Sequence, residues 1–225
     1  TGSSYIAYFQ AYTNTYASLA YLEKLYMEAI LHPDIRILSI ATRPDCLSTE
    51  ILDLLERLNQ IKPVWVELGL QTIHERTARY IRRGYDLPVF ETAVSELRRR
   101  GIDVIVHTIL CLPGETKPDM LQTIQYLNRQ DIQGIKLQLL HILKDTDLAE
   151  IYASDPLPVP DPQEYYELLG ACISHLRPDI VIHRLTGDGP KELLIAPLWT
   201  CNKRQVLNQL QSYFKTHDIW QGKEY

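Results

Sequence analysis

The chain has 225 residues, of which 45% are hydrophobic and 23% charged, so it can bury a full core and falls within the size range of one α/β barrel domain. A net charge of −5 argues against a broadly basic surface for nucleic acid. The four cysteines, Cys46, Cys111, Cys172 and Cys201, lie far apart without a C-x-x-C, which gives neither a disulfide framework nor a cysteine-rich metal site. No run of 18 apolar residues is present. We therefore expect one domain, residues 1–225, in the cytoplasm and away from membranes.

Short apolar runs alternate with amphipathic ones along the whole chain. Strands are expected at 5–9, 35–40, 64–70, 103–110, 132–140 and 180–185, and helices at about 22–30, 48–58, 73–83, 88–100, 161–175 and 202–214. This βα repeat of about 30 residues predicts parallel strands joined by crossover helices. A barrel is favoured over an open doubly wound sheet, because no G-x-G-x-x-G follows the first strand and polar residues recur at the strand ends.

The stretch Gly101–Glu115, read G-I-D-V-I-V-H-T-I-L-C-L-P-G-E, carries the clearest local pattern. Gly101 follows three arginines and is expected to end a helix, because glycine adopts positive φ without strain. A strand buried on both faces follows, and then a tight turn. Thr116 with Asp119 predicts a capping box for the next helix. In parallel α/β folds this carboxyl end of the strands is where ligands bind.

Several polar residues stand inside or just after the predicted strands. Glu67 is costly to bury alone, so it either faces a wet barrel mouth or meets a cation, with a structural ion pair to Arg43 as the alternative. Gln71 either orients a ligand or simply starts a helix. His107, His141 and His183 are of a residue type that binds metal, but each could instead satisfy an interior hydrogen bond.

The last predicted strand ends in a second polar group. Arg184 and Asp188 either clamp a substrate carboxylate or phosphate or pair with each other. Between them, the turn Thr186–Gly189 has the glycines that a phosphate-binding barrel enzyme would need.

Two motifs together carry a resemblance to a known family. The sequence E-L-G-L-Q at Glu67–Gln71, followed by H-T-I-L-C-L-P-G-E, resembles the paired signatures of radical S-adenosylmethionine (SAM) enzymes of the elongator, methylthiotransferase and coproporphyrinogen-oxidase type. The segments A-Y-F-Q-A-Y-T-N-T, S-I-A-T-R-P-D-C-L and H-R-L-T-G-D-G-P-K-E-L-L-I-A-P-L-W further resemble uncharacterised bacterial Fe–S oxidoreductases of this superfamily. The resemblance covers essentially the whole chain.

The resemblance implies an α/β fold, an incomplete parallel (β/α) barrel of about six strands with a C-terminal extension from about residue 186. The family's first strand and its loop C-x-x-x-C-x-x-C, whose thiolates hold a [4Fe–4S] cluster, have no counterpart in this sequence, so it resembles an N-terminally truncated enzyme. The full-length enzyme would use SAM and the cluster, cleaving SAM reductively to a radical that abstracts a substrate hydrogen. We expect the chain alone to be inactive and to bind no cluster.

The resemblance also assigns cofactor-binding positions. Asn14 takes the place of the family's G-G-E, which binds the SAM amino group, and Thr42 and Arg43 stand where the family contacts the SAM carboxylate or the substrate. Glu67 and Gln71 match residues that face the ribose and the methionyl group. The remaining cofactor-binding candidates are His107 in the long strand, Leu112 and Pro113 in the apolar turn beside adenine, and His141 at the adenine edge.

Partners follow from the same resemblance. It implies an electron donor such as flavodoxin or ferredoxin and a substrate that is RNA, a protein or a small molecule. A strand at residues 5–9 without a preceding neighbour would leave an open edge, which predicts a dimer through that strand or a cover by the C-terminal tail. Two other classes of function remain, a phosphate-binding barrel enzyme and a noncatalytic binding or scaffold module.

Overall fold

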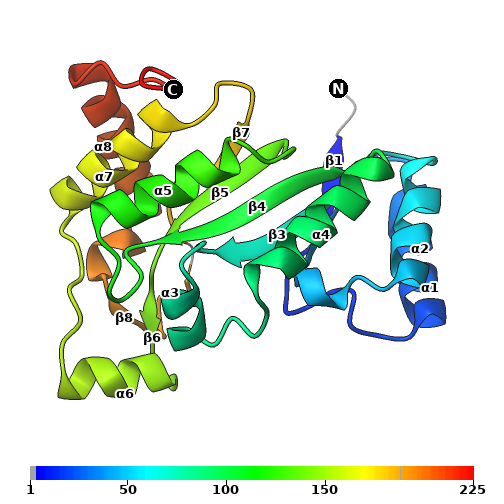
Figure 1. The fold of residues 1–225 in the computed structure, drawn as a ribbon, viewed down its shortest axis with the longest axis horizontal. Coiled ribbons are helices and arrows are strands. Elements are labelled where there is room, and N and C mark those ends of the chain that lie inside the picture. The colour runs from blue at the N-terminus through cyan, green and yellow to red at the C-terminus, as the bar shows by residue number, and fades with distance from the viewer. Residues whose placement is uncertain (1–3, 188) are drawn as a thin grey trace. The chain divides into compact units, whose positions relative to one another are not determined.

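The computed structural model describes residues 4–187 and 189–225 (Figure 1). They form two compact units that interleave along the sequence. The first unit runs to Leu70 and takes in Arg83–His107 and Gln130–Ile135, and the second comprises Gln71–Arg82, Thr108–Arg129 and Lys136–Tyr225. The expectation of a single domain therefore remains a prediction.

The first unit pairs parallel strands with helices. Its elements are β1 (Tyr5–Phe9), α1 (Leu19–Leu31), β2 (Ile35–Thr42), the 3₁₀ turn η1 (Pro44–Cys46), α2 (Thr49–Asn59), most of β3 (Val64–Gln71) and α4 (Leu87–Arg99). Tyr8 of β1 is in register with Ser39 of β2, and Ala41 of β2 with Glu67 of β3. The apolar stripe of α2, namely Ile51, Leu54, Leu55 and Leu58, is buried as its helical spacing predicts.

The second unit is mainly helical and contains a small second sheet. Its elements are α3 (Glu75–Tyr80), α5 (Lys117–Leu127), β6 (Ile142–Leu143), α6 (Asp147–Ser154), α7 (Pro162–His175), β7 (Val181–Arg184), β8 (Leu194–Ala196), the 3₁₀ turn η2 (Leu198–Cys201) and α8 (Lys203–Thr216). The predicted capping box of α5 is present, because the Asp119 carboxylate accepts from the backbone N–H of Thr116 at 2.7 Å. α5 packs against α7 (Figure 1).

The main sheet has six parallel strands in the order β1-β2-β3-β4-β5-β7. β4 (Asp103–Leu110) and β5 (Gly134–Leu139) contribute residues to both units. This confirms the predicted fold class, an α/β fold with the strands of an incomplete radical SAM barrel. Gly101 has φ +70° after α4, as the turn before β4 requires. β1 stands at one end of the strand order, which leaves its outer edge without a neighbouring strand among the described residues.

Four elements differ from the sequence-based expectation. The helix expected at 73–83 is shorter, because the Thr72 hydroxyl accepts from the backbone N–H of His74 at 3.1 Å and α3 begins only after it. β6 and β8 pair antiparallel across about 50 residues, a contact that local periodicity does not predict. α6 was also unexpected, and none of its residues is buried.

The C-terminal tail packs on α7. The backbone N–H of Gly222 donates to the carbonyl of Ile173 at 3.2 Å, and that of Glu224 to Ser174 at 2.8 Å. A Cβ added to Gly170 of α7 would lie 2.7 Å from Cδ1 of Ile219. Gln221 Nε2 also donates to the carbonyls of Arg177 and Ile180, both at 2.7 Å, so the tail packs on α7 and on the segment that follows it. Within the described part of the chain, no helix has both the length and the hydropathy of a membrane span.

Candidate functional site

A buried carboxylate lies at the centre of the first unit. Glu67 is 4% exposed, and three donors from three other strands point to it. Ser39 Oγ donates to Oε1 at 2.8 Å, Tyr8 Oη donates to Oε2 at 2.8 Å, and His107 Nε2 lies 2.6 Å from Oε2. We call Tyr8, Ser39, Glu67 and His107 the Glu67 cluster. It brings together one residue from each of β1, β2, β3 and β4.

The alternation of the strands explains why these side chains meet. Successive residues of a strand point to opposite faces, so Glu67 shares a face with Trp65 and Gly69, while Val66 and Leu68 are fully buried on the other side. In β4 the face with Val104 and Val106 is likewise fully buried, whereas the side chain of His107 is 20% exposed. The cluster therefore belongs to the less covered face of the strands.

The Glu67 cluster fixes the orientation of its histidine. An ionised Glu67 would only accept hydrogen bonds, which would place the shared proton on Nε2 of His107. A carboxylate behind an imidazole commonly holds the ring and its tautomer in this way. Sequence reasoning named Glu67 and His107 and missed Tyr8 and Ser39.

Arg43 does not pair with Glu67, so the ion pair considered as the alternative for Glu67 is wrong. Its guanidinium forms a bidentate contact with Asp45, with Nε to Oδ1 at 2.9 Å and Nη2 to Oδ2 at 2.6 Å. The hydrogen bond to Asp45 raises the pKa of Arg43, and the same bond lowers the pKa of Asp45. The guanidinium also lies over the Tyr85 ring, 5.3 Å from its centroid. Asp45 lies two residues after Arg43, in the 3₁₀ turn η1, and its carboxylate is within hydrogen-bond distance of the guanidinium.

Asn14 and Thr42 tie the loop after β1 to the end of β2. Asn14 Nδ2 donates to the carbonyls of Phe9 and Ala41 at 3.0 and 2.9 Å. The hydroxyls of Thr15 and Thr42 lie 2.6 Å apart, and Thr42 is 6% exposed. The amide nitrogen of Asn14 is thus committed to the backbone, which leaves its Oδ1 as the atom that a ligand amine could reach.

Two candidate positions have unusual backbone conformations. Gln71, the last residue of β3, has φ +62°, and Cys111, the first residue after β4, also has φ +62°. Cys111 stands where the resemblance places a glycine, and positive φ gives the physical reason for glycine at that position. Both residues therefore turn the chain at a strand end.

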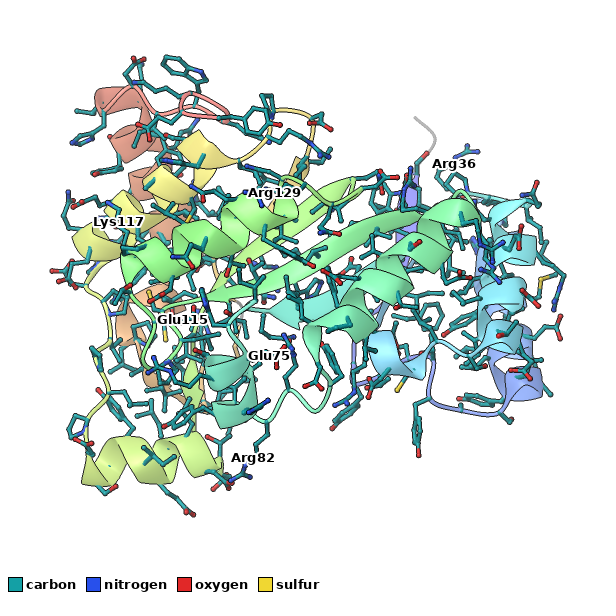
Figure 2. All side chains as sticks on the ribbon, viewed as in Figure 1. Arg36, Glu75, Arg82, Glu115, Lys117 and Arg129 are labelled. Atoms are coloured by element: carbon teal, nitrogen blue, oxygen red, sulfur yellow. The ribbon has the colours of Figure 1, made fainter. Side chains whose placement is uncertain are left out.

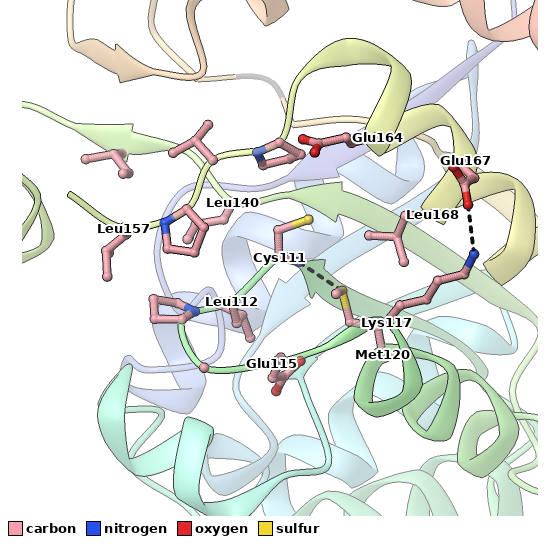
Figure 3. A pocket seen from close by; sticks show the side chains of 16 residues that line it. Cys111, Leu112, Glu115, Lys117, Met120, Leu140, Leu157, Glu164, Glu167 and Leu168 are labelled. Carbon is pink, nitrogen blue, oxygen red and sulfur yellow. Dashed lines mark hydrogen bonds and ion pairs between the residues drawn. The ribbon is translucent and has the colours of Figure 1, made fainter.

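The turn after β4 lines a cavity of about 550 Å³ in the second unit (Figure 3). Leu112 is 2% exposed, and Pro113 and Leu140 line the same cavity. The backbone N–H of Cys111 points to Met120 Sδ at 3.1 Å. Figure 2 shows Glu115 at the end of this turn and Lys117 at the start of α5. The apolar turn expected from the sequence is therefore present.

The glycines of the last loop pack around a histidine. A Cβ added to Gly187 would lie 2.6 Å from Cε1 of His141, and one added to Gly189 would lie 2.8 Å from its Nδ1. Close approach to the ring thus accounts for both glycines without a phosphate. Arg184 is half-buried at the end of β7. Asp188, its expected partner, lies outside the described residues.

No set of three or more His, Cys, Asp or Glu side chains in the described part of the chain is placed to hold a metal ion. Burial raises the pKa of the Cys111 and Cys172 thiols to about 12, which disfavours the thiolate that a cluster needs.

Similarity to known proteins agrees with the motifs. The radical SAM superfamily matches residues 1–127, and the Radical_SAM C-terminal domain matches residues 132–216. An uncharacterized protein of Bacillus subtilis, YtqA, is 41% identical over 219 residues, which cover 97% of this chain and 68% of YtqA. The protein YhcC of Escherichia coli is 37% identical over 216 residues, covering 96% of this chain and 70% of YhcC.

The fold is similar to that of a solved elongator protein. The archaeal Methanocaldococcus infernus Elp3 with an N-terminal deletion superposes with a TM-score of 0.81 at 15% identity, over 98% of this chain and 56% of that chain. At that identity the likeness concerns the fold alone. The assignment to a superfamily rests on the two family matches and on the 41% identity to YtqA. The chain belongs to the radical SAM superfamily.

Proposed function

We propose that this chain forms the SAM-binding wall of a radical SAM enzyme. The observation that carries the proposal is the Glu67 cluster, in which a buried carboxylate is held by donors from β1, β2 and β4. A well-packed apolar group can often replace a buried ionic cluster as a whole without loss of stability, and buried charges concentrate at functional sites. The family match supplies SAM as the ligand that such a wall would meet.

The chain's own cysteines do not fit a [4Fe–4S] cluster. Such a cluster requires three converging thiolates, and the described residues contain no grouping of that kind. Cys172 is a buried residue of α7, and Cys111 lies in the turn after β4. The cluster would therefore need a C-x-x-x-C-x-x-C from outside these 225 residues, together with an electron donor such as a flavodoxin or ferredoxin. We expect the 225-residue chain alone to take up no cluster iron.

The contacts of each candidate residue refine its proposed role. We propose that Glu67 orients His107 and that the His107 imidazole and the Tyr8 ring face the bound SAM. Asn14 would offer Oδ1 to the SAM amino group while its Nδ2 holds the loop. Arg43 would meet a ligand carboxylate only by leaving Asp45. In the second unit, Leu112 and Pro113 would pack on adenine and the backbone at His141 would meet its edge.

We further propose that the full-length enzyme cleaves SAM reductively and abstracts a hydrogen atom from its substrate. The test is anaerobic iron–sulfur reconstitution of the full-length protein, followed by measurement of 5′-deoxyadenosine after addition of a reductant. Glu67→Gln should lower SAM affinity and 5′-deoxyadenosine formation, whereas Glu50→Gln, at a fully exposed carboxylate, should change neither. Formation of no 5′-deoxyadenosine by a protein with a full cluster would refute the proposal.

A further inference from the structure

The cavity proposed to hold adenine has one wall that differs from the others. Residues 157–160 line it together with the turn after β4, the start of α5 and the first turns of α7 (Figure 3). They belong to the segment 155–162, read D-P-L-P-V-P-D-P, in which every second residue is proline. Alternating prolines keep a chain extended and stiff, so we expect this wall to move as one piece.

The other walls are firmly held. Arg76 Nη2 donates to the carbonyl of Gly114 in the turn after β4 at 2.9 Å, and the backbone N–H of Cys111 points to Met120 Sδ at 3.1 Å. A capping box fixes the start of α5, and a second one fixes the start of α7. Hydrogen bonds thus attach three sides of the cavity to neighbouring elements.

The proline-rich wall has a single polar anchor. Prolines have no N–H group, and among the described residues the backbone of 156–160 makes one hydrogen bond, in which Trp199 Nε1 donates to the carbonyl of Pro160 at 3.0 Å. The Trp199 ring packs against two buried tyrosines, with 5.8 Å between its centroid and that of Tyr165 and 6.2 Å to that of Tyr166. One well-packed indole therefore holds this wall to the rest of the second unit.

The chain that leads into this wall is also loosely attached. None of the residues of α6 is buried. The ion pair of Asp147 with Arg82, at 2.5 Å, joins two largely exposed side chains, and such pairs add little stability. Asp145, before α6, has φ +60°, a conformation typical of a turn. Local opening costs least where few residues are buried, so residues 145–160 can move while the elements at both ends stay in place.

We propose that residues 145–160 form a flap, which opens to admit SAM and closes over its adenine, and that Trp199 is the positioning residue that holds the flap closed. The inference rests on the proposed function for the identity of the ligand. A cavity that surrounds most of its ligand needs a movable side for entry and release. Among the described walls, the flap is the one that can open without breaking a capping box. Leu157 and Val159 would then close over the adenine beside Leu112.

The first test is hydrogen exchange, measured by mass spectrometry on the full-length protein without ligand. Amides of residues 146–159 should exchange about tenfold faster than those of α5. Trp199→Phe should raise exchange in the flap about fivefold, through the loss of one hydrogen bond, and should leave α5 unchanged. Trp220→Phe, at an exposed indole in the tail, is the matched control and should change neither. Exchange in the flap as slow as in α5, or equal effects of the two variants, would overturn the proposal.

The second test adds SAM to the full-length protein with its cluster reconstituted. In the unaltered protein, SAM should slow exchange in the flap about threefold or more, and this result decides if Trp199→Phe does not fold. In Trp199→Phe, the association and dissociation rates of SAM should both rise about fivefold while Kd stays the same, because entry and release pass through the same opening. A fixed wall predicts a higher Kd with an unchanged association rate, and that result would overturn the flap.

Binding of SAM separates the flap from the proposed function. If SAM does not bind to a protein with a full cluster, the proposed function is refuted, and the ligand of the flap with it. If SAM binds and exchange in residues 146–159 stays the same, the flap alone is refuted.

Discussion

Replacing Glu67 by alanine should destabilise the first unit well beyond an ordinary surface change. The substitution leaves the donors of Ser39, Tyr8 and His107 without their acceptor. A hydrogen bond to a charged group is worth about 1.5–3 kcal/mol. Ser39 is 2% exposed and bears this cost in full, while Tyr8 and the 20% exposed His107 can partly rehydrate. We therefore expect a loss of about 3–4 kcal/mol in the free energy of unfolding.

The assay is urea denaturation followed by circular dichroism, with Glu50→Ala as the exposed control. A double-mutant cycle tests the mechanism. In a Ser39→Ala background, Glu67→Ala should cost about 1 kcal/mol less, because one of the donors is already gone. A loss below about 1 kcal/mol for Glu67→Ala, or the same loss with and without Ser39, would show that the cluster does not hold the strands together. Calorimetry of the full-length protein then separates the effect on SAM affinity from the effect on the fold.

Three further changes have defined outcomes. At pH 8, iodoacetamide should alkylate Cys201 and Cys46 well before Cys111 and Cys172, because a pKa of about 12 leaves the last two thiols with almost no thiolate. Peptide mass spectrometry measures the order, and equal reaction of all four cysteines would contradict the prediction. Gly187→Ala should lower the melting temperature more than Gly101→Ala. A Cβ at residue 187 would lie 2.6 Å from His141, whereas nothing lies within 4 Å of a Cβ at residue 101, where the substitution adds only the strain of positive φ. A larger loss for Gly101→Ala would refute the packing argument. The lowered pKa of Asp45 adds stability that is present above the unfolded pKa of the carboxyl group and is lost as the pH falls through the folded pKa. Asp45→Asn should therefore weaken the loss of folding stability at acidic pH, by less than about 1 kcal/mol because the pair is exposed. An unchanged dependence of stability on acidic pH would contradict this prediction.

The sequence predicted much of the fold because most signals were local. The spacing of leucines in α2, the capping box of α5 and the glycine after α4 each depend on a few neighbouring residues. β6 and β8 depend on a pairing between residues about 50 apart, for which no neighbouring residue gives a signal.

The candidate site was predicted in part for the same reason. A carboxylate inside an apolar strand is conspicuous, so Glu67 could be named without a structure. Tyr8 and Ser39 are ordinary residues of their strands, and only the register between strands makes them partners of Glu67. The alternative for Glu67, an ion pair with Arg43, is wrong because Arg43 donates two hydrogen bonds to the carboxylate of Asp45, a partner that was not considered from the sequence.

The bidentate pair of Arg43 and Asp45 also sets a limit on recognition. A partner two residues away is present at a very high effective concentration, so an incoming carboxylate competes with a tethered copy of its own functional group. The free energy gained on binding is then only the difference between two similar pairings. Arg43 would therefore add little affinity for carboxylates in general, and would favour a ligand whose other groups already hold it in place. Such an arrangement favours ligands that are recognised by several of their groups over ligands that are attracted by a single charge.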